Sequence, residues 1–350
     1  MMENKHTKDD LIQMQSLPLS AKILMTKRRI RDWYDYFDGQ VYVSFSGGKD
    51  STVLLHIVRQ LYPDVEAVFV DTGLEYPEIR QFVKTFNNVT ILRPKMRFDQ
   101  VIKKYGYPII SKEVSLAIWY ARKGSKWANN YFNGLDGKGK QHSFKKAMYS
   151  KYKPLTEMDF VCSDKCCRNM KEKPLDDYVK ITGRKPITAI MASESKKREM
   201  AWLHTGCNAF DEKKPMSKPM SFWTEQDVLQ YIKQNNIPIA SVYGDVVYSK
   251  NKDQIRIEEY GLDNCGTEKL CTTGCDRTGC IFCAFGAHLE KGESRFERLK
   301  RTHPRQYEYC IGGGEYDENG IWQPNKKGLG MGHIFDELNK IYGDDFIKYK

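Results

Sequence analysis

The sequence predicts an α/β fold with a parallel sheet, and two observations lead to this class. Between residues 40 and 92, short runs of β-branched and aromatic residues alternate with segments of helical periodicity. A glycine-rich loop at 46–51 separates the first run from the helical segment that follows it. Strands separated by single helices need crossover connections, which favour parallel strands covered by helices. A third observation, two clumps among the ten cysteines, predicts a cysteine-rich C-terminal module beside this domain.

The individual elements follow from the spacing of apolar residues. A continuous apolar, β-branched run predicts a buried strand, and apolar residues three or four positions apart predict a helix. Thr224, with Asp227 three residues later, is typical of a helix N-terminus. Strands are expected at 40–45, 66–71, 89–92 and 185–191. Helices are expected at 11–38, 52–61 and 76–86, from about Pro174, and after Thr224.

Positive charge is concentrated in one segment. The chain has 350 residues, and 56 Lys and Arg against 45 Asp and Glu give a formal charge of +11. Residues 95–155 hold 14 of these cations with three carboxylates and eleven aromatic residues. Cations interleaved with aromatic rings suit a polyanion with exposed bases, so a nucleic-acid partner is expected at 95–155. The alternative is a lid whose aromatic residues pack into a small core of their own.

The sequence also indicates the compartment. The N-terminus is charged and lacks the apolar stretch of a secretory signal. A membrane helix needs about 18 uninterrupted apolar residues, and no stretch of this sequence approaches that length. We therefore expect a cytoplasmic protein without a membrane partner. In that compartment, clumped cysteines favour metal ligation or redox chemistry over disulfides.

The loop Ser46-Gly47-Gly48-Lys49-Asp50-Ser51 has the features of a phosphate-binding loop. Two glycines let backbone N–H groups approach an anion, and the start of a helix adds partial positive charge. Serine hydroxyls and the Lys49 ammonium supply further donors. It is not a Walker A loop, because the GxxxxGK[ST] pattern is absent. The alternative is an ordinary turn between a strand and a helix.

These residues carry a family resemblance. SGGKDS resembles the PP-loop of the adenine nucleotide α-hydrolase superfamily, whose members bind ATP and usually split it to AMP and pyrophosphate. Three further segments resemble motifs of its PAPS (phosphoadenosine phosphosulfate) reductase branch, in that family's order. They are a DTG motif at 70–78, an "ES…R" segment at 192–198 and a "PL-x-W-x-x-x-D-V" helix at 219–228. The resemblance covers about residues 40–285 and implies an enzyme with the HUP-type fold of that superfamily.

The resemblance also implies roles for individual residues. The nucleotide would be ATP, or adenylyl sulfate or PAPS, with Mg²⁺ bridging phosphates. The residues implied to hold it are Ser46, Gly47, Gly48, Lys49, Asp50, Ser51, Asp71 and Thr72. The residues implied in catalysis are Lys49, Asp50, Asp71 and Arg198. Two alternatives stay open: Asp71 as the cap of the next helix, and Arg198 on a solvated, charged helix face.

The cysteines extend the resemblance to adenylyl-sulfate reductases. Cys166-Cys167 resembles their CC pair and Cys280-x-x-Cys283 their CxxC, and in that family these two pairs bind a [4Fe–4S] cluster. Cys166, Cys167, Cys280 and Cys283 are therefore the implied ligands, with Cys275 as a substitute. Adjacent thiolates suit a cluster better than one tetrahedral zinc, because they can reach different irons. Structural zinc and free buried thiols remain the alternatives.

Three parts of the chain are expected from these motifs. Residues 1–38 would form an N-terminal helical segment. Residues 39–240 would form the PP-loop nucleotide-binding domain, with the basic insertion at about 95–155. Residues 241–350 would form the cysteine-rich module that contributes cluster ligands. The Gly-rich stretch 311–332 receives no role.

One departure from the family pattern bears on the reaction. Sulfonucleotide reductases attack sulfur with a cysteine in a C-terminal ECG(I/L)H tail, and the only cysteine here beyond Cys283 is Cys310, without an adjacent His. The leading hypothesis is an iron–sulfur PP-loop ATP pyrophosphatase that adenylates a target, expected to be nucleic acid, for sulfur transfer from a donor protein. One alternative is a sulfonucleotide reductase-like enzyme that uses Cys310 or an external thiol or reductant protein. Another is a non-catalytic regulator that binds nucleotide and nucleic acid.

Overall fold

The computed structural model describes residues 4–136, 138–141, 148–249 and 269–350. Contacts within the chain divide it into two compact units, and each is assembled from separate stretches of sequence. The sheet unit comprises residues 1–71, 75–92 and 175–278. The helical unit comprises residues 72–74, 93–174 and 279–350.

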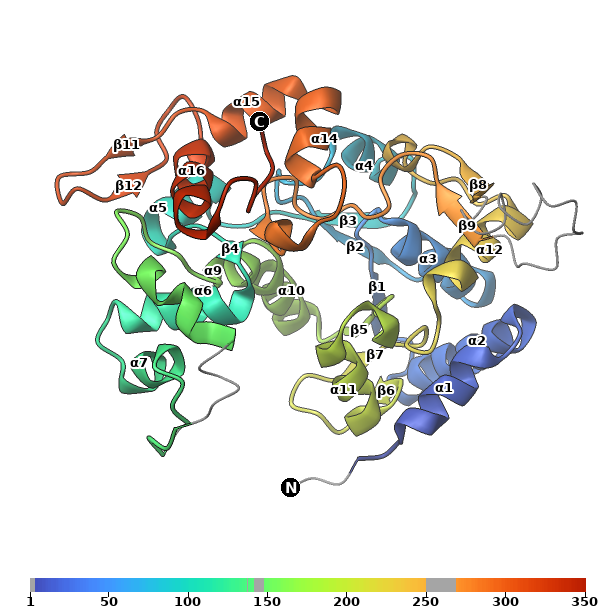
Figure 1. The fold of residues 1–350 in the computed structure, drawn as a ribbon. Coiled ribbons are helices and arrows are strands. Elements are labelled where there is room, and N and C mark those ends of the chain that lie inside the picture. The colour runs from blue at the N-terminus through green and yellow to red at the C-terminus, as the bar shows by residue number, and fades with distance from the viewer. Residues whose placement is uncertain (1–3, 137, 142–147, 250–268) are drawn as a thin grey trace, which may run out of the picture. The chain divides into compact units, whose positions relative to one another are not determined.

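A six-stranded sheet forms the centre of the sheet unit (Figure 1). Its order is β3-β2-β1-β5-β7-β6, and neighbouring strands are parallel except β6, which runs antiparallel to β7. The strands are β1 (Val41–Ser44), β2 (Ala67–Val70), β3 (Val89–Leu92), β5 (Lys185–Ile187), β6 (Asn208–Ala209) and β7 (Met216–Ser217). The predicted parallel sheet is confirmed, although the strand expected at 185–191 ends at Ile187.

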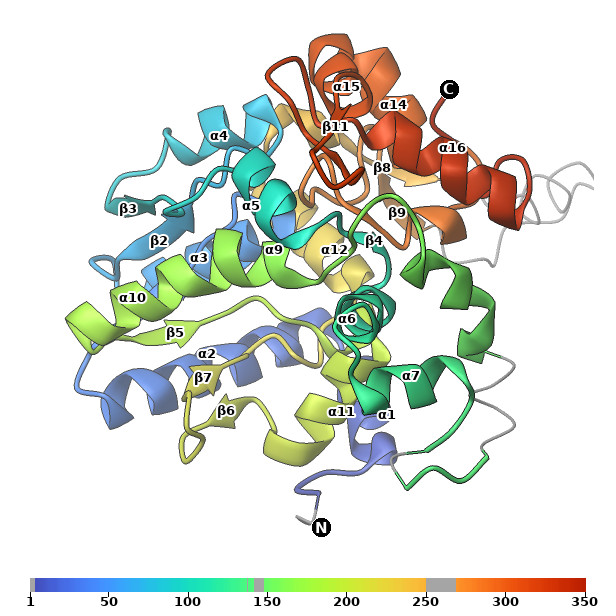
Figure 2. The same ribbon diagram turned by 90° about the vertical axis from the view of Figure 1, so that its left-hand side faces the viewer.

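Helices cover both faces of this sheet. Figure 2 shows α10 on one side and α2 and α3 on the other. Tyr178 of α10 packs on Tyr42 and Val68, which project from β1 and β2. The helices are α1 (Lys8–Ser16), α2 (Leu19–Tyr36), α3 (Lys49–Leu61), α4 (Pro77–Val83), α11 (Lys196–Thr205), α12 (Glu225–Asn235) and most of α10 (Lys173–Thr182). A hairpin of β8 (Val246–Ser249) and β9 (Lys269–Thr272) completes the described part of this unit.

The single helix expected at 11–38 is wrong, because the chain breaks there into α1 and α2. Pro18 has no N–H to donate, and it disfavours a helical conformation in the residue before it. Leu17 is accordingly extended, with φ −63° and ψ 149°, and Pro18 becomes the N-cap of α2. The proline was visible in the sequence and marks the break.

A buried ion pair joins α2 to α12. Lys22 is 2% exposed, and its Nζ lies 2.6 Å from Oδ2 of Asp227, which is 7% exposed. The same carboxylate accepts hydrogen bonds from the backbone and hydroxyl of Thr224, and Thr224 accepts one from the Asp227 N–H. This capping box confirms the helix start predicted from Thr224 and Asp227.

The helical unit contains most of the basic insertion, which folds largely into helices. Its short parallel pair β4 (Ile109–Ile110) and β10 (Ala284–Phe285) joins the insertion to the segment after Cys283. The helices are α5 (Phe98–Tyr105), α6 (Lys112–Ala121), α7 (Lys126–Phe132), α9 (Lys165–Cys167), α14 (Arg295–Thr302), α15 (Pro304–Ile311) and α16 (Met331–Tyr342). A β-hairpin, β11 (Glu315–Tyr316) and β12 (Trp322–Gln323), occupies part of the Gly-rich stretch.

Half of the described aromatic residues of the insertion are buried in this unit. The buried ones, between 1% and 7% exposed, are Phe98, Tyr107, Tyr131, Phe132 and Tyr152. Trp127 is an exception, at 45% exposed, and Phe144 lies outside the described residues. Some of these rings pack against the segment after Cys280, since Phe98 lies beside Phe282 and Tyr152 beside Tyr342, so the core is shared with that segment.

The compact units cut across the three consecutive parts expected from the sequence. The N-terminal helices α1 and α2 belong to the sheet unit, and the helical unit unites 166–167 with 280–283. Within the residues that the structure describes, no helix is both long enough and apolar enough to span a bilayer.

Candidate nucleotide loop and cysteine site

The loop 46–51 lies at the carboxyl end of β1, where parallel α/β sheets bind ligands. Gly48 is the N-cap of α3, so the first N–H groups of that helix face the loop. Gly47 has φ +71°, and a Cβ there would lie 2.7 Å from Val83 and 2.8 Å from Ile79. A side chain at this position would therefore meet α4. The glycine allows the close approach of loop and helix.

Two serines hold the shape of the loop. The Ser46 N–H donates to Ser51 Oγ at 3.2 Å, and the two hydroxyl oxygens are 3.0 Å apart. Ser51 Oγ also donates to the Gly48 carbonyl at 2.9 Å. The Ser51 hydroxyl is thus engaged within the loop, and its expected role as a phosphate donor stays a prediction.

Lys49 is 3% exposed and directs its ammonium at protein groups. Its Nζ donates to the Asp276 carbonyl at 2.6 Å and lies 3.1 Å from a carboxylate oxygen of Glu225. The Lys49 N–H donates to the hydroxyl of Tyr243 at 3.2 Å, and that oxygen is 2.5 Å from the Thr278 hydroxyl. A phosphate that binds Lys49 has to replace Asp276 and Glu225 as its partners.

Asp50 lies beside two guanidinium groups. Its Oδ1 is buried, and the described residues offer it no hydrogen-bond partner. Burial raises the pKa of Asp50, while the charges of Lys49, Arg277 and Arg198 act in the opposite direction. Burial lowers the pKa of Arg198, and the nearby charge of Arg277 lowers it further. The structure thus brings together Lys49, Asp50 and Arg198, and adds Arg277, which no sequence motif singled out.

Three of the expected residues have local partners. Asp71 follows β2, and its side chain, 10% exposed, forms a 2.9 Å ion pair with Arg80 of α4. It does not cap α4, whose N-cap is Tyr76. Thr72 belongs to the helical unit, where its hydroxyl accepts the Leu74 N–H at 3.1 Å. Arg198 forms an ion pair with Glu194, one turn before it. The nucleotide roles of these residues remain predictions.

The two distant cysteine pairs converge within the helical unit. One small cavity is lined by Leu74, Phe98, Pro108, Cys166, Cys167, Met170, Lys171, Cys280 and Cys283. The Cys283 N–H donates to the Cys280 carbonyl at 3.0 Å, which closes a tight turn around the second pair. A π-helical turn at Arg168–Glu172 directly follows the first pair. Such turns are frequent at functional sites.

The thiols in this cavity affect one another. A hydrogen bond from Cys166, with help from the Lys112 ammonium, holds the pKa of Cys167 below its ordinary value. The same bond raises the pKa of Cys166, which is also buried. Burial raises the pKa of Cys283 to about 11, and the Arg295 charge opposes that change. One thiolate of the set is therefore favoured, as metal ligation requires.

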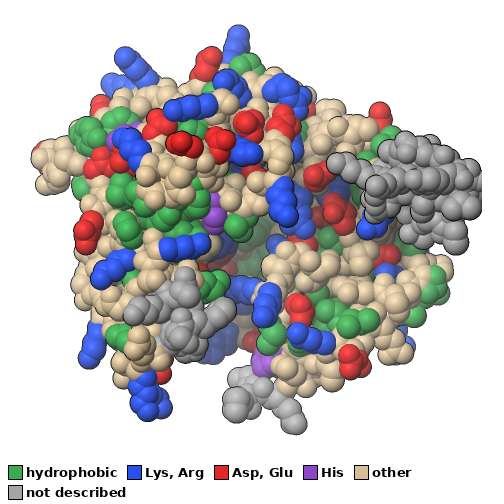
Figure 3. Space-filling view, viewed as in Figure 1, with side chains coloured by type: hydrophobic (Ala, Val, Ile, Leu, Met, Phe, Trp, Pro, Cys, Tyr) green, Lys and Arg blue, Asp and Glu red, His purple; other side chains and the backbone are tan. Residues whose placement is uncertain are grey.

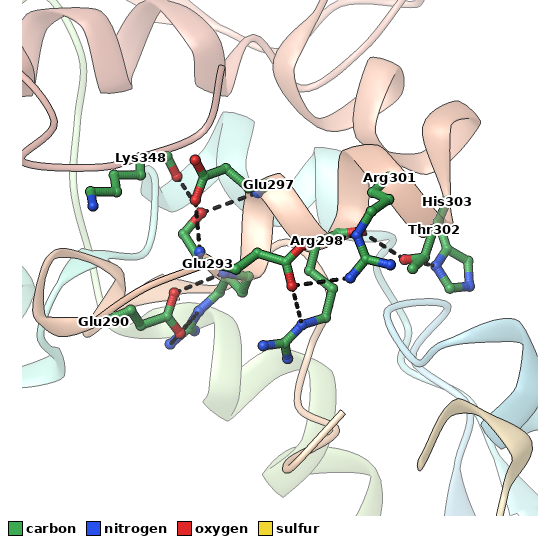
Figure 4. Close-up of polar contacts among 10 residues, drawn as sticks. Glu290, Glu293, Glu297, Arg298, Arg301, Thr302, His303 and Lys348 are labelled. Atoms are coloured by element: carbon green, nitrogen blue, oxygen red, sulfur yellow. Dashed lines mark hydrogen bonds and ion pairs between the residues drawn. The ribbon is translucent and has the colours of Figure 1, made fainter. Parts of the chain in front are cut away.

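Arg295 braces the second cysteine pair. Its Nη1 donates to the Cys283 carbonyl at 2.9 Å, and its Nε donates to Glu290 at 2.8 Å. Figure 4 shows Glu290 in the segment before α14, and Glu293, also before the helix, reaching Arg298 and Arg301 of α14. A capping box also stabilises the first turn of α14, and this turn contains Arg295.

Replacing Arg295 with alanine is expected to weaken metal retention by the cysteine site about tenfold. Residues that orient metal ligands typically change affinity by about 10–100-fold when they are removed. Arg295→Lys is expected to rescue little, because lysine lacks the planar fork that joins Glu290 to the Cys283 carbonyl. The measurement is chelator-driven metal loss after reconstitution, with Arg298→Ala on the same helix as the control. Equal loss rates in Arg295→Ala and the wild type would contradict the bracing role.

The remaining cysteines lie elsewhere. Cys162 is fully buried, and burial raises its pKa. Cys275 belongs to the sheet unit, and its carbonyl accepts the Thr272 hydroxyl. Cys310 is also fully buried, and its thiol donates to the sulfur of Met331 at 3.5 Å. Cys275 is not among the residues that line the cavity, which favours the CC and CxxC pairs as the ligand set.

The donor set of the cavity is compatible with an iron–sulfur cluster. Zinc needs all its sulfur ligands about 2.3 Å from a single point. Among the described residues, no group of three or more His, Cys, Asp or Glu side chains is placed to hold one metal ion. A [4Fe–4S] cluster takes each thiolate on a different iron, so its ligands stand farther apart. Four cysteines on one otherwise mainly apolar cavity are compatible with that arrangement.

Comparison with known proteins bears on the family. A family model described as "Phosphoadenosine phosphosulfate reductase domain" matches residues 40–285. The chain belongs to this family. The membership expected from the loop and the cysteine motifs is thereby confirmed, together with the α/β fold. The matched range holds the loop 46–51 and all four cavity cysteines.

Individual relatives of this PAPS reductase family member differ in how much they match. The adenosine 5′-phosphosulfate reductase of Staphylococcus epidermidis is 25% identical over 214 residues, which cover 60% of this chain and 68% of that protein. Uncharacterized protein MJ0973 of Methanocaldococcus jannaschii is 36% identical over 87 residues, 23% of this chain and 21% of that protein. The match to this relative thus spans about a fifth of its length.

The solved PAPS reductase of Candida auris is 15% identical, with a TM-score of 0.36 over 68% of this chain and 92% of that one. The expectation of an enzyme is supported at the level of the family, which is described as a reductase domain and includes the Staphylococcus epidermidis reductase.

Proposed function

We propose that this chain is an iron–sulfur enzyme that activates a nucleic-acid target with ATP for sulfur transfer. The observation that carries the proposal is the convergence of Cys166, Cys167, Cys280 and Cys283 on one cavity, in a chain that also carries the loop 46–51. Family membership supports the adenine nucleotide as substrate. The sulfur donor would be a separate protein.

The first step would be adenylation. An oxygen of the target attacks the α-phosphorus of ATP, a new P–O bond forms, and the bond to the β-phosphate oxygen breaks as pyrophosphate leaves. The departing pyrophosphate gains negative charge, which the N–H groups at the start of α3 and the Lys49 ammonium are suited to stabilise. Arg198 and Arg277 add two fixed cations next to Asp50. Mg²⁺ would bridge the phosphates.

The second step would be displacement. A sulfur nucleophile attacks the carbon that bears the adenylated oxygen, a C–S bond forms, and AMP leaves with the oxygen. When bound, a [4Fe–4S] cluster held by these four thiolates would supply electron transfer. The chain's own part is to hold Cys166, Cys167, Cys280 and Cys283 as thiolates in a cavity walled by Leu74, Phe98 and Met170.

A reductase-like reaction on adenylyl sulfate is the second candidate, favoured by the names of the relatives. Cys310 is a poor nucleophile for it. The Cys310 thiol is fully buried, so a substrate cannot reach it. Burial also raises its pKa, so little of the nucleophilic thiolate forms. A reductase of this kind would therefore depend on an external thiol.

Pyrophosphate release tests the proposal. Anaerobically reconstituted protein is incubated with ATP and Mg²⁺, with and without single-stranded or duplex nucleic acid. Pyrophosphate is expected to form in an amount equal to the AMP transferred to the nucleic acid, because free AMP leaves only when a sulfur nucleophile displaces it. Replacing Lys49 with methionine is expected to lower the rate about 100-fold, the scale for loss of a charge-stabilising donor. Lys213→Met, an exposed lysine of the same unit, is the control.

The alternatives predict different outcomes in the same assay. No pyrophosphate under any of these conditions would refute the adenylation step. Sulfite release from adenylyl sulfate with an added thiol would then establish the reductase-like reaction. Tight nucleotide binding with no product in either assay would indicate a regulator.

A further inference from the structure

Three aromatic residues of the insertion lie together at its surface. Trp119 and Tyr120 lie in the last turn of α6, with ring centroids 5.0 Å apart, and Tyr120 lies 5.5 Å from Trp127 of α7. Trp119 and Tyr120 are half-buried, whereas Trp127 is 45% exposed. The exposed indole of Trp127 is available to a planar partner.

Two lysines are held against these rings. Lys123 Nζ lies 3.4 Å from the ring centroid of Trp119, and Lys165 Nζ lies 5.1 Å from it. A ring attracts an ammonium without neutralising it, so the cation stays available to an anion. Lys165 also has a carboxylate partner, Asp164, at 3.3 Å. Lys123 is exposed and has no carboxylate partner among the described residues.

The charge around these rings is predominantly positive. Figure 3 shows mainly Lys and Arg side chains over α6 and α7, with few Asp and Glu side chains. Residues 112–141 contain the carboxylates Glu113 and Asp136. Asp136 accepts the backbone N–H groups of Lys138 and Lys140, and Glu113 faces the Tyr131 and Tyr149 hydroxyls. Both carboxylates thus have partners other than Lys123 and Lys126.

We propose that the surface formed by Trp119, Tyr120, Lys123, Lys126, Trp127 and Lys165 binds an unpaired strand of nucleic acid. The lysines would contact phosphates, and Trp127 would stack on a base. An unpaired strand is favoured over a duplex, because bases present their faces only when they are unstacked from a helix. The inference rests on the proposed nucleic-acid target and names the surface that holds it.

Fluorescence anisotropy with a labelled 20-nucleotide strand, as DNA and as RNA, tests the inference. Lys123→Gln with Lys126→Gln is expected to weaken binding at least tenfold at low salt. The slope of log affinity against log salt concentration is expected to fall by about 1.4, since each phosphate contact on a single strand contributes about 0.7. Trp127→Leu is expected to weaken binding about tenfold, the scale of one base stack, and to leave the salt slope unchanged.

The matched control is a second exposed cation–aromatic pair. In the sheet unit, Lys233 Nζ lies 4.4 Å from the ring centroid of Tyr248, which is 53% exposed. Lys233→Gln and Tyr248→Leu are expected to leave the affinity for the strand unchanged.

The inference would be overturned if Lys123→Gln, Lys126→Gln and Trp127→Leu left the affinity for the strand unchanged, or if the control substitutions lowered it equally. Equal binding of a duplex, or binding of phosphatidylserine vesicles in place of oligonucleotides, would also overturn it. Melting temperatures within a few degrees of the wild type show that each variant is folded.

The outcome is separable from that of the proposed function. If the wild type releases pyrophosphate but binds no oligonucleotide, the surface is wrong and the ATP chemistry stands. If these residues bind a strand but no pyrophosphate forms, the surface stands and the adenylation step is wrong. ATP affinity is expected to be the same in the surface variants as in the wild type.

Discussion

Replacing Lys22 with methionine is expected to lower the free energy of unfolding of the sheet unit by about 3–5 kcal/mol. Breaking a buried ion pair by removing one partner leaves the other charge buried without compensation, and that is the usual cost. Here the remaining charge is the Asp227 carboxylate, whose 2.6 Å contact with Lys22 Nζ would be lost. Thr224 would still hydrogen-bond to it, but a neutral hydroxyl does not replace an ammonium.

Urea denaturation of Lys22→Met, followed by circular dichroism, measures this loss. Arg28→Met, an exposed cation on the same helix, is the control and is expected to change stability little. Adding Asp227→Asn to Lys22→Met is expected to restore most of the lost stability, because it removes the uncompensated charge and keeps a capping oxygen. A loss below about 1 kcal/mol in the single variant would show that the pair is not buried as described.

Replacing Cys167 or Cys283 with serine is expected to reduce iron bound after anaerobic reconstitution at least tenfold. Each residue lines the cavity on which the two pairs converge, and the remaining thiols cannot supply a fourth sulfur ligand. Removing residues that only support metal ligands costs about 10–100-fold in affinity, so removing a ligand is expected to cost no less.

Visible absorption and metal analysis check this result. The wild type is expected to show the brown thiolate-to-iron absorption, and each variant to lose it. Cys271→Ser is the control, because Cys271 lies in β9 of the sheet unit and does not line the cavity. Zinc in place of iron, without visible absorption, would show that the site is structural. An equal loss in Cys271→Ser would show that the ligand set is wrong.

Local chemistry explains which parts of this fold could be predicted from sequence. The capping box of Thr224 and Asp227 and the glycine loop depend on residues close together in the chain, and both were predictable. Pro18 carried an equally local signal for the break between α1 and α2. The core of the basic insertion could not be predicted, because the same aromatic residues serve a packed core or a binding surface. Only tertiary packing separates buried Tyr131 from exposed Trp127.

The site divides in the same way. The family motifs indicated the four cavity cysteines, and the structure places them together. They did not indicate Arg295, whose role depends on a contact with a carbonyl that any residue at 283 would present. Arg277 does not belong to any of the family motifs either. Its charge acts on Asp50 and Arg198 only because the fold brings these residues together. The burial of Lys49 against Asp276 could not be predicted either, because the two residues are far apart in the chain.

The interleaving of the two compact units has a consequence for biosynthesis. The ribosome releases β1, β2 and β3 early, but their neighbour β5 and the buried partner of Lys22 emerge only after residues 93–174 have been made. Those residues in turn lack β10 and α14–α16 until the segment 279–350 follows. The sheet unit can therefore finish folding only after residue 278 has been made, and the helical unit only after synthesis ends, so apolar strand surfaces stay open to chaperones until late in translation.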